Sequence, residues 1–157
     1  MRLRKATWFE TKVSYQKMME DGLEKKVTEL YVLDAFTFTD AEARMTEEMS
    51  SYVSGEFKIT DIKPASYGEI VFSDAADAES WFKVKIALIT LDEKSGKEKR
   101  QSVYYLVQAS TLRGAVSSID EFMRGTMCDY EVASVAKTAV LDVFEHHANP
   151  LAAQNED

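Results

Sequence analysis

Hydrophobic and polar residues alternate in two stretches of the chain, residues 8–15 and 81–88. Every second position from Phe9 and from Phe82 is apolar except Thr11, and charged residues such as Lys12 and Lys85 occupy positions between them. A period of two places the apolar side chains on one face of an extended strand. Both stretches are therefore predicted to be half-buried β-strands.

A turn signal follows each of these strands. The first is Asp21-Gly22 and the second is Ser95-Gly96, and in both the glycine can adopt the positive φ that a tight hairpin turn requires. The residues beyond each turn, about 24–34 and 99–108, are rich in Val, Leu and Tyr, which is typical of central strands. Each half of the chain is thus predicted to begin with a β-hairpin.

The spacing of apolar residues after each hairpin predicts an amphipathic helix. In the first half we expect the helix to begin at Thr39, with Glu42 as its capping-box partner, and to end near Gly55. In the second half we expect Ser110 as the N-cap and Gly125 as the end. The residues expected to face the core are Ala41, Met45, Met49, Tyr52 and Val53 in the first helix, and Leu112, Ala115, Val116, Ile119, Phe122 and Met123 in the second.

A strand with one irregular step is predicted after each helix. Its apolar positions are Phe57, Ile59 and Ile62 in the first half, and Tyr130, Val132 and Val135 in the second. The wider final step breaks the alternation and indicates a β-bulge at the same place in both halves. Short strands at about residues 69–72 and 140–144 are expected to close each half.

The two halves therefore match in order, beginning with Trp8-Phe9 and Trp81-Phe82. We predict an α+β fold of two β-β-α-β-β repeats, about residues 7–72 and 80–145, which form antiparallel sheet with two packed helices and a pseudo-twofold axis. The repeats are expected to share one core and to form a single domain over residues 1–148, followed by a polar tail at 149–157.

Three stretches also carry a resemblance to a known family. They are WFETKVSY through FTFTDAEAR at residues 8–44, WFKVKIALITLDEKSGKEKR at 81–100 and GTMCDYEVASV at 125–135. The chain resembles, over nearly its whole length except the tail, an uncharacterised domain-of-unknown-function family of Bacteroidetes-type gut bacteria and their phages. The resemblance implies a phage or mobile-element accessory protein, and it implies no reaction, cofactor or site residue.

Composition narrows the class of protein. The chain has 157 residues, of which 45% are hydrophobic, and no run approaches the roughly 20 apolar residues that cross a bilayer. Its first residues lack a signal-peptide core, and its single cysteine, Cys128, cannot form an intramolecular disulfide. We therefore expect a cytoplasmic protein without membrane contact, in which Cys128 is a small buried hydrophobic residue.

No motif supports a definite catalytic or metal site. His146 and His147 are adjacent, so in a strand their side chains point to opposite faces and do not share an ion. The segment Lys94–Lys97 joins two strands and lacks the spacing of a phosphate-binding loop, and no protease signature surrounds Cys128. We expect no metal, no cofactor and no enzymatic activity, and an enzyme with a cleft between the repeats is the third interpretation.

The positive charges are concentrated in two regions, although the net charge of −8 disfavours non-specific binding to polyanions. Residues 1–28 hold seven Lys and Arg against four Asp and Glu, and residues 81–100 hold six against three. Each region contains a predicted strand in which a tryptophan lies on the same face as a lysine. Basic strands with interleaved aromatic residues are typical of surfaces that bind single-stranded nucleic acid.

We therefore expect a non-enzymatic binding protein that contacts single-stranded nucleic acid through the two basic hairpins. The residues expected to form this surface are Trp8, Lys12, Lys25, Lys26, Trp81, Lys83, Lys85, Lys99 and Arg100. Two alternatives stay open: the lysines protect strand edges while both tryptophans are buried, or the protein is an interaction module or a homodimer formed through strand edges. Exposed tryptophans beside the lysines would favour nucleic-acid binding, and buried tryptophans would favour the edge-protection alternative.

Overall fold

The computed structural model describes residues 6–146, which form two helices and eight strands. The chain divides into two compact units. Among the described residues, unit 1 consists of those up to Ala65 together with those from Val140, and unit 2 is Ser66–Ala139. The predicted α+β class is confirmed. The predicted polar tail lies outside the described residues.

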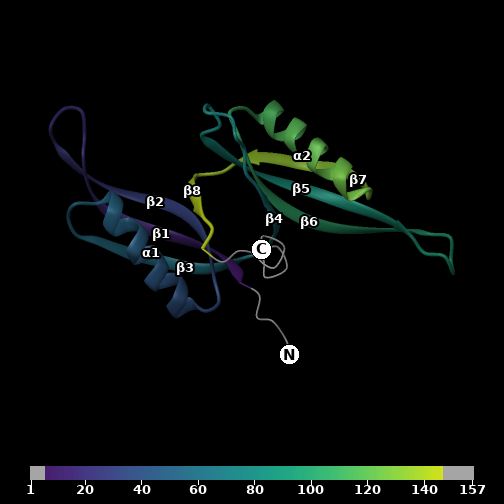
Figure 1. Ribbon diagram of the computed structural model, residues 1–157, viewed down its shortest axis with the longest axis horizontal. Helices are drawn as coiled ribbons and strands as arrows, with labels where there is room; N and C mark the ends of the chain where they lie inside the picture. Colours follow the sequence, from purple (N-terminus) through teal and green to yellow (C-terminus); the bar gives the residue numbers. More distant parts are fainter. Residues whose placement is uncertain (1–5, 147–157) are drawn as a thin grey trace, which may run out of the picture. The chain divides into compact units, whose positions relative to one another are not determined.

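Unit 1 is a four-stranded sheet with one helix (Figure 1). Strands β1 (Thr7–Met18) and β2 (Glu24–Ala35) form the hairpin, α1 (Phe38–Tyr52) follows, and β3 (Phe57–Ala65) pairs antiparallel with β1. The fourth strand, β8 (Val140–Phe144), comes from the far end of the described chain and pairs in parallel with β2. The strand order is therefore β3-β1-β2-β8.

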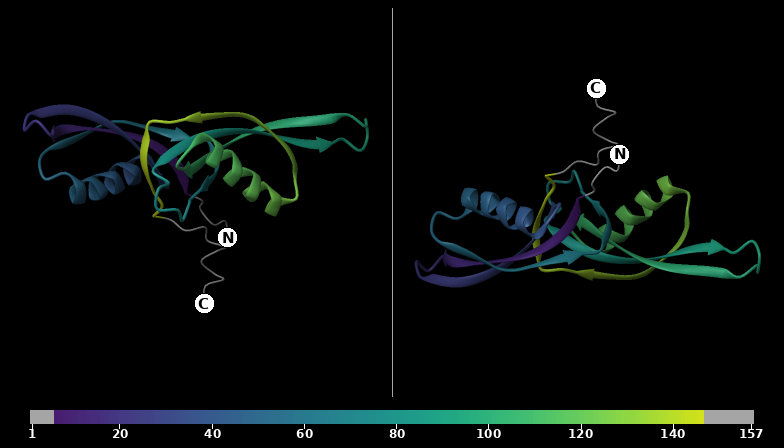
Figure 2. Two further views of the ribbon diagram at one scale, coloured as in Figure 1. Left: turned by 90° about the horizontal axis from the view of Figure 1, so that it is seen from above. Right: turned by 90° about the horizontal axis from the view of Figure 1, so that it is seen from below.

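Unit 2 has the same arrangement within one continuous segment. Its hairpin is formed by β5 (Ser80–Leu91) and β6 (Glu98–Ala109), and it is followed by α2 (Leu112–Thr126) and β7 (Asp129–Lys137), which pairs antiparallel with β5. The short strand β4 (Tyr67–Val71) precedes the hairpin and pairs in parallel with β6. Figure 2 shows that within each unit the helix lies on one face of its own sheet.

The short strands β4 and β8 do not close the halves in which the sequence pattern placed them. β4 follows β3 after a single residue, Ser66, yet it belongs to the sheet of unit 2. The edge beside β2 lies three strand spacings from β3, about 14 Å, and one residue spans at most about 3.6 Å. A strand that directly follows β3 cannot reach that edge, so β8 fills it. The units consequently divide the chain at Ala65 and Ala139 and not near residues 72 and 80.

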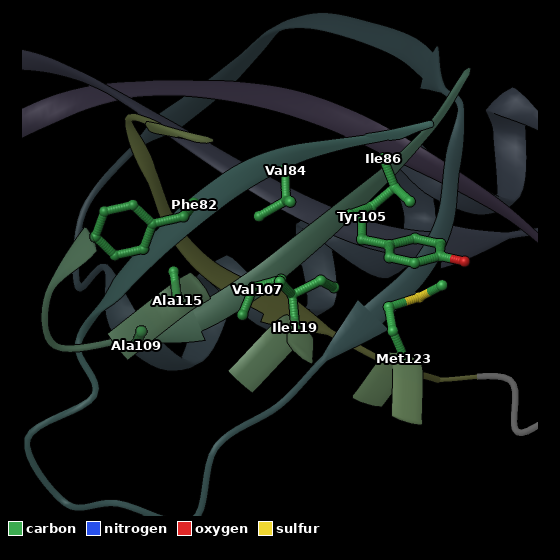
Figure 3. Packing of buried hydrophobic residues seen from close by; sticks show 9 residues of the cluster. All are labelled: Phe82, Val84, Ile86, Tyr105, Val107, Ala109, Ala115, Ile119 and Met123. Carbon is green, nitrogen blue, oxygen red and sulfur yellow. The ribbon is translucent and has the colours of Figure 1, made fainter. Parts of the chain in front are cut away.

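Two clusters of buried hydrophobic side chains lie one in each unit. Three other fully buried residues, Val32, Leu106 and Trp81, belong to neither cluster, so the shared core expected from the sequence stays a prediction. In unit 1, Phe9, Val13 and Leu33 of the hairpin belong to one cluster with Met45 and Met49 of α1. The cluster of unit 2, shown in Figure 3, consists of Phe82, Val84, Ile86, Tyr105, Val107, Ala109, Ala115, Ile119 and Met123. Alternate residues of each hairpin thus face the helix, and the residues between them lie on the opposite, helix-free face.

Each helix begins beside the residue predicted to cap it. The N-cap of α1 is Thr37 and not Thr39, and the Thr37 hydroxyl accepts a hydrogen bond from the Asp40 backbone N–H at 3.0 Å. The N-cap of α2 is Thr111 and not Ser110, and its hydroxyl accepts from a first-turn N–H at 3.0 Å. Serine and threonine hydroxyls both cap helices, so local sequence did not decide between neighbouring candidates.

Neither glycine that was expected to end a helix does so. α1 ends at Tyr52, before Gly55 is reached, and α2 continues through Gly125 to Thr126. The residue after α2, Met127, adopts the left-handed conformation with a φ of 58°, and its side chain is 93% exposed. This conformation costs a residue with a side chain about 1–2 kcal/mol, so the C-terminus of α2 lacks the unstrained cap that glycine would provide.

The predicted bulges and turn glycines are confirmed. Thr60 in β3 and Ala133 in β7 are left unpaired where the register with the neighbouring strand shifts. Gly22 and Gly96 have φ values of 81° and 69°. Equal strand orders and matching bulges are what a duplication predicts, while the superposition of residues 8–62 on 81–135 and the pseudo-twofold axis stay predictions.

Replacing Thr111 by Ala is expected to lower the free energy of unfolding by about 1 kcal/mol, because it removes the acceptor for a backbone N–H at the start of α2. The matched control is Ser110→Ala, since Ser110 is exposed and does not cap the helix. Urea unfolding of the two variants measures the difference. Equal losses would contradict the assignment of Thr111 as the cap.

Candidate nucleic-acid interface

The helix-free face of unit 1 carries three of the four residues predicted for this half. Strand alternation places Trp8, Lys12 and Lys26 on this face, whereas Lys25 points to the side on which α1 packs. Trp8 is half-buried, and both lysines on the face are exposed. The structure therefore brings part of the predicted set together and separates Lys25 from it.

A further lysine, Lys58, joins this face from β3. It lies opposite Ser14 of β1. A hollow of about 280 Å³ lies here, lined by Ser14, Tyr15, Gln16, Lys26, Glu56, Phe57, Lys58 and Thr60. Charge counting along the chain missed Lys58 because it lies outside the basic hairpin, and only the pairing of β3 with β1 brings it to this face. Carboxylates offset part of this charge, since Lys12 lies opposite Asp61.

Trp81 is buried, which corrects its prediction as a stacking residue. It lies on the helix-free face of unit 2, yet it is only 1% exposed. The Phe72 ring, just beyond β4, packs edge-on against it with the ring centroids 5.5 Å apart. An aromatic ring must be accessible to stack on a base, so Trp81 cannot serve that role in this conformation.

Arg100 lies on the same face of unit 2 and is held in an ion pair. Its guanidinium donates to both carboxylate oxygens of Glu131 on β7, at 2.6 and 3.3 Å. These hydrogen bonds lower the pKa of the Glu131 carboxyl, so the pair is charged at neutral pH. Arginine binds phosphate with the same forked geometry, and a phosphate would therefore compete with Glu131 for Arg100. Lys99 points to the opposite face of β6.

Two tyrosines that the sequence pattern did not single out lie beside Lys83. The Lys83 ammonium nitrogen lies 4.7 Å from the centroid of the Tyr104 ring and 6.0 Å from that of Tyr67. Tyr104 and Tyr67 are paired residues of β6 and β4, so strand pairing brings the rings together. Lys83 is exposed, and both rings and Lys85 are half-buried. We call Lys83, Lys85, Tyr67 and Tyr104 the Lys83 patch.

On the helix side of unit 1, Glu29 lies between two tyrosines. The Tyr31 hydroxyl donates to the Glu29 carboxylate at 3.1 Å, and burial together with the charge of Glu29 raises the pKa of Tyr31. Burial and a hydrogen bond with Glu29 raise the pKa of Tyr15 to about 12. Tyr31 belongs to the unit 1 core and Tyr15 packs against it, so this cluster is part of the packing of the unit.

Two other residues considered from the sequence lie away from the lysines. Cys128 is exposed, and not buried as expected, because it lies between the left-handed Met127 and the first residue of β7. His146 follows β8, and its Nε2 atom lies 3.0 Å from a Glu48 carboxylate oxygen without hydrogen-bond geometry. Among residues 6–146, no three His, Cys, Asp or Glu side chains are grouped to hold a metal ion, and His147 lies outside this range.

Comparison with known proteins places the chain in a family. The sequence model of one family, DUF4494, matches residues 7–146. This family is described as a domain of unknown function, and the chain belongs to it. No curated protein and no solved structure matches the chain. Neither helix of the described residues is long and apolar enough to cross a membrane. The family description assigns no activity.

The free energy of unfolding is expected to fall as the pH rises from about 10 to about 12. The pKa of Tyr15 is about 12 in the folded protein against an ordinary value of 10.0, so the unfolded chain releases this proton first and alkaline pH favours unfolding. The stabilising contribution is complete below pH 10.0 and is lost as the pH rises through the folded value. Urea unfolding at several pH values measures the effect, and Tyr15→Phe should weaken it. An unchanged profile in that variant would exclude Tyr15 as a source.

Trp81→Ala is expected to lower the free energy of unfolding by about 3–5 kcal/mol, as truncation of a buried aromatic side chain does. Trp8→Ala, at the half-buried corresponding position, should lower it less. Thermal melting of the two variants, combined with an oligonucleotide titration, separates stability from binding. A Trp81→Ala variant that keeps its stability but loses affinity for oligonucleotides would show that the ring is accessible to ligands after all.

Proposed function

We propose that this member of the DUF4494 family is a non-enzymatic protein that binds single-stranded nucleic acid through the helix-free face of unit 2. One observation carries the proposal: Lys83 and Lys85 lie beside two tyrosine rings on the sheet face opposite α2. Lysines contact phosphates and aromatic rings stack on bases in single-strand-binding surfaces. The proposed aromatic residues are Tyr67 and Tyr104, in place of Trp81.

Lys83 would couple phosphate binding to base binding. In the free protein its ammonium lies over the Tyr104 ring, where a cation–π contact at an exposed site contributes about 0.5–1 kcal/mol. A charge-assisted hydrogen bond to a phosphate oxygen is the stronger interaction, so a phosphate would draw the ammonium off the ring. The face of Tyr104 would then be open to a base.

The acidity of the whole chain limits the expected affinity but does not exclude it. The net charge is −8, yet a bound strand responds mainly to charges within a Debye length, about 8 Å at physiological salt. On the helix-free face of unit 2, Lys83 and Lys85 lie close to the tyrosines. The binding should therefore be local and strongly dependent on salt.

Replacing both Lys83 and Lys85 by Gln is expected to weaken binding to single-stranded oligonucleotides and to flatten its salt dependence by about two phosphate contacts. The matched control replaces Lys25 and Lys99 by Gln, which removes the same charge from the opposite strand faces. Fluorescence anisotropy of a labelled oligonucleotide at several salt concentrations measures the affinity of each variant and its salt dependence. Equal losses in the two double variants would show that net charge, and not this face, sets the affinity.

Tyr104→Leu separates stacking from charge within the same titration. It should weaken binding by about 1–3 kcal/mol while leaving the salt dependence unchanged, because a stacked ring releases no counterions. If the natural protein fails to bind single strands even at low salt, the nucleic-acid function is wrong. A protein-interaction module then becomes the better proposal.

The biological setting is part of the proposal. The resemblance to proteins of Bacteroidetes-type bacteria and their phages supports a cytoplasmic accessory protein of a phage or mobile element. A protein that handles single strands fits such a setting, since replication and transfer of these elements expose single-stranded DNA. Gene neighbourhoods in genomes that encode the family test this: consistent placement among unrelated metabolic genes would count against it.

A further inference from the structure

β7 forms an open edge of unit 2. It is the outermost strand of the described sheet, with β5 as its sheet neighbour. An outermost strand presents a row of backbone N–H and C=O groups that can pair with another strand. β3 occupies the equivalent outermost position in unit 1. The two edges differ in where they carry charged residues and proline.

The stretch after the bulge is better protected against edge pairing on β3 than on β7. β3 carries Asp61, Lys63 and Pro64 after its bulge, and charged residues and proline on an edge strand prevent it from accepting another strand. At the same distances from its own bulge, β7 carries Ser134, Ala136 and Lys137. The run Val132–Ala136 therefore contains neither charge nor proline.

We propose that the free edge of β7 pairs antiparallel with β7 of a second copy of this chain, which joins the two unit 2 sheets into one symmetric sheet. The bulge at Ala133 divides β7 into two regular runs, 129–132 and 134–137. The alternation of faces reverses across a bulge. The helix-side residues of both copies lie on the same face of the joined sheet when residues 129–132 of one copy pair with residues 134–137 of the other. Val132 then lies opposite Val135, and Tyr130 lies opposite Lys137.

This register is self-complementary on the helix side of the sheet. Val132 and Val135 are half-buried residues packed against the unit 2 core, and each would meet its counterpart across the dimer and extend that core. Lys137 of the second copy would lie beside Tyr130, whose hydroxyl donates to Asp120 at 2.7 Å. The lysine would thus meet an aromatic ring and a carboxylate. Two-fold symmetry makes each pair occur twice.

Charge complementarity on the helix side favours a second copy as the occupant of this edge. Lys137 of each copy would meet Tyr130 and the Asp120 carboxylate of the other copy. Asp129 and Glu131 lie on the opposite sheet face, where Glu131 stays paired with Arg100. A parallel partner in register would place like charges together. The inference does not rest on nucleic-acid binding, and it leaves the Lys83 patch on a sheet face and not at the joined edge.

The molar mass in solution tests the proposal. Size-exclusion chromatography with light scattering over a dilution series should show a dimer that dissociates at low concentration. Ser134→Asp combined with Ala136→Lys copies two edge residues of β3 into β7 and should give a monomer at every concentration, with circular dichroism reporting its fold. The matched control, Asp61→Asn on β3, should leave the dimer intact. A natural chain that is monomeric throughout the series overturns the proposal.

Ser134→Cys provides a second test that does not depend on the folding of the double variant. In a Cys128→Ser background this side chain would lie next to the two-fold axis, so mild oxidation should link two chains through a disulfide. Thr39→Cys, at an exposed position of α1, is the control and should stay unlinked. A dimer that persists in the Ser134→Asp, Ala136→Lys variant, or a Ser134→Cys chain that links no better than the control, also overturns the proposal. Neither measurement requires an oligonucleotide, so failure of the dimer proposal can be told apart from failure of the proposed function.

Discussion

The sheet of each unit depends on a short strand that pairs in parallel with the central strand of the hairpin, β8 with β2 and β4 with β6. The central strands are apolar on both faces, and Val32 and Leu33 of β2 have no exposed surface. An unfilled edge beside them would leave backbone groups and apolar side chains in water. Because β4 follows β3 too closely to reach β2, unit 1 is completed by residues from the far end of the described chain.

The same pairing creates the candidate site of unit 2. Tyr67 belongs to the short strand β4 and Tyr104 to the central strand β6, and their register places both rings near the Lys83 ammonium. The strand that closes the sheet thus also supplies one side of the proposed binding surface. Phe72, immediately after that strand, packs against Trp81. The segment Tyr67–Phe72 therefore adds a tyrosine to the helix-free face and contributes to the burial of the tryptophan expected there.

The two units share strand order and bulge position but differ at their surfaces. In unit 1 the outer edge is protected by charge and by Pro64, and lysines on the helix-free face lie near carboxylates such as Asp61. In unit 2 the corresponding edge has neither charge nor proline over Val132–Ala136, and the helix-free face presents lysines beside tyrosines. Both proposed surfaces consequently lie on unit 2. A shared strand order with different surface residues would allow unit 2 to take the proposed partners while unit 1 keeps its edge closed.

The sequence by itself determined the features that depend on near neighbours. Alternation located the hairpins, a single irregular step located the bulges at Thr60 and Ala133, and the turn glycines were identified by their need for positive φ. The helix starts were less certain, because more than one hydroxyl residue that can cap a helix lies near each start. Only the tertiary structure decided which sheet receives β4 and β8, that Trp81 is buried, and that Tyr67 and Tyr104 lie beside Lys83. Each of these outcomes depends on contacts between segments distant in the chain, and local periodicity carries no information about such contacts.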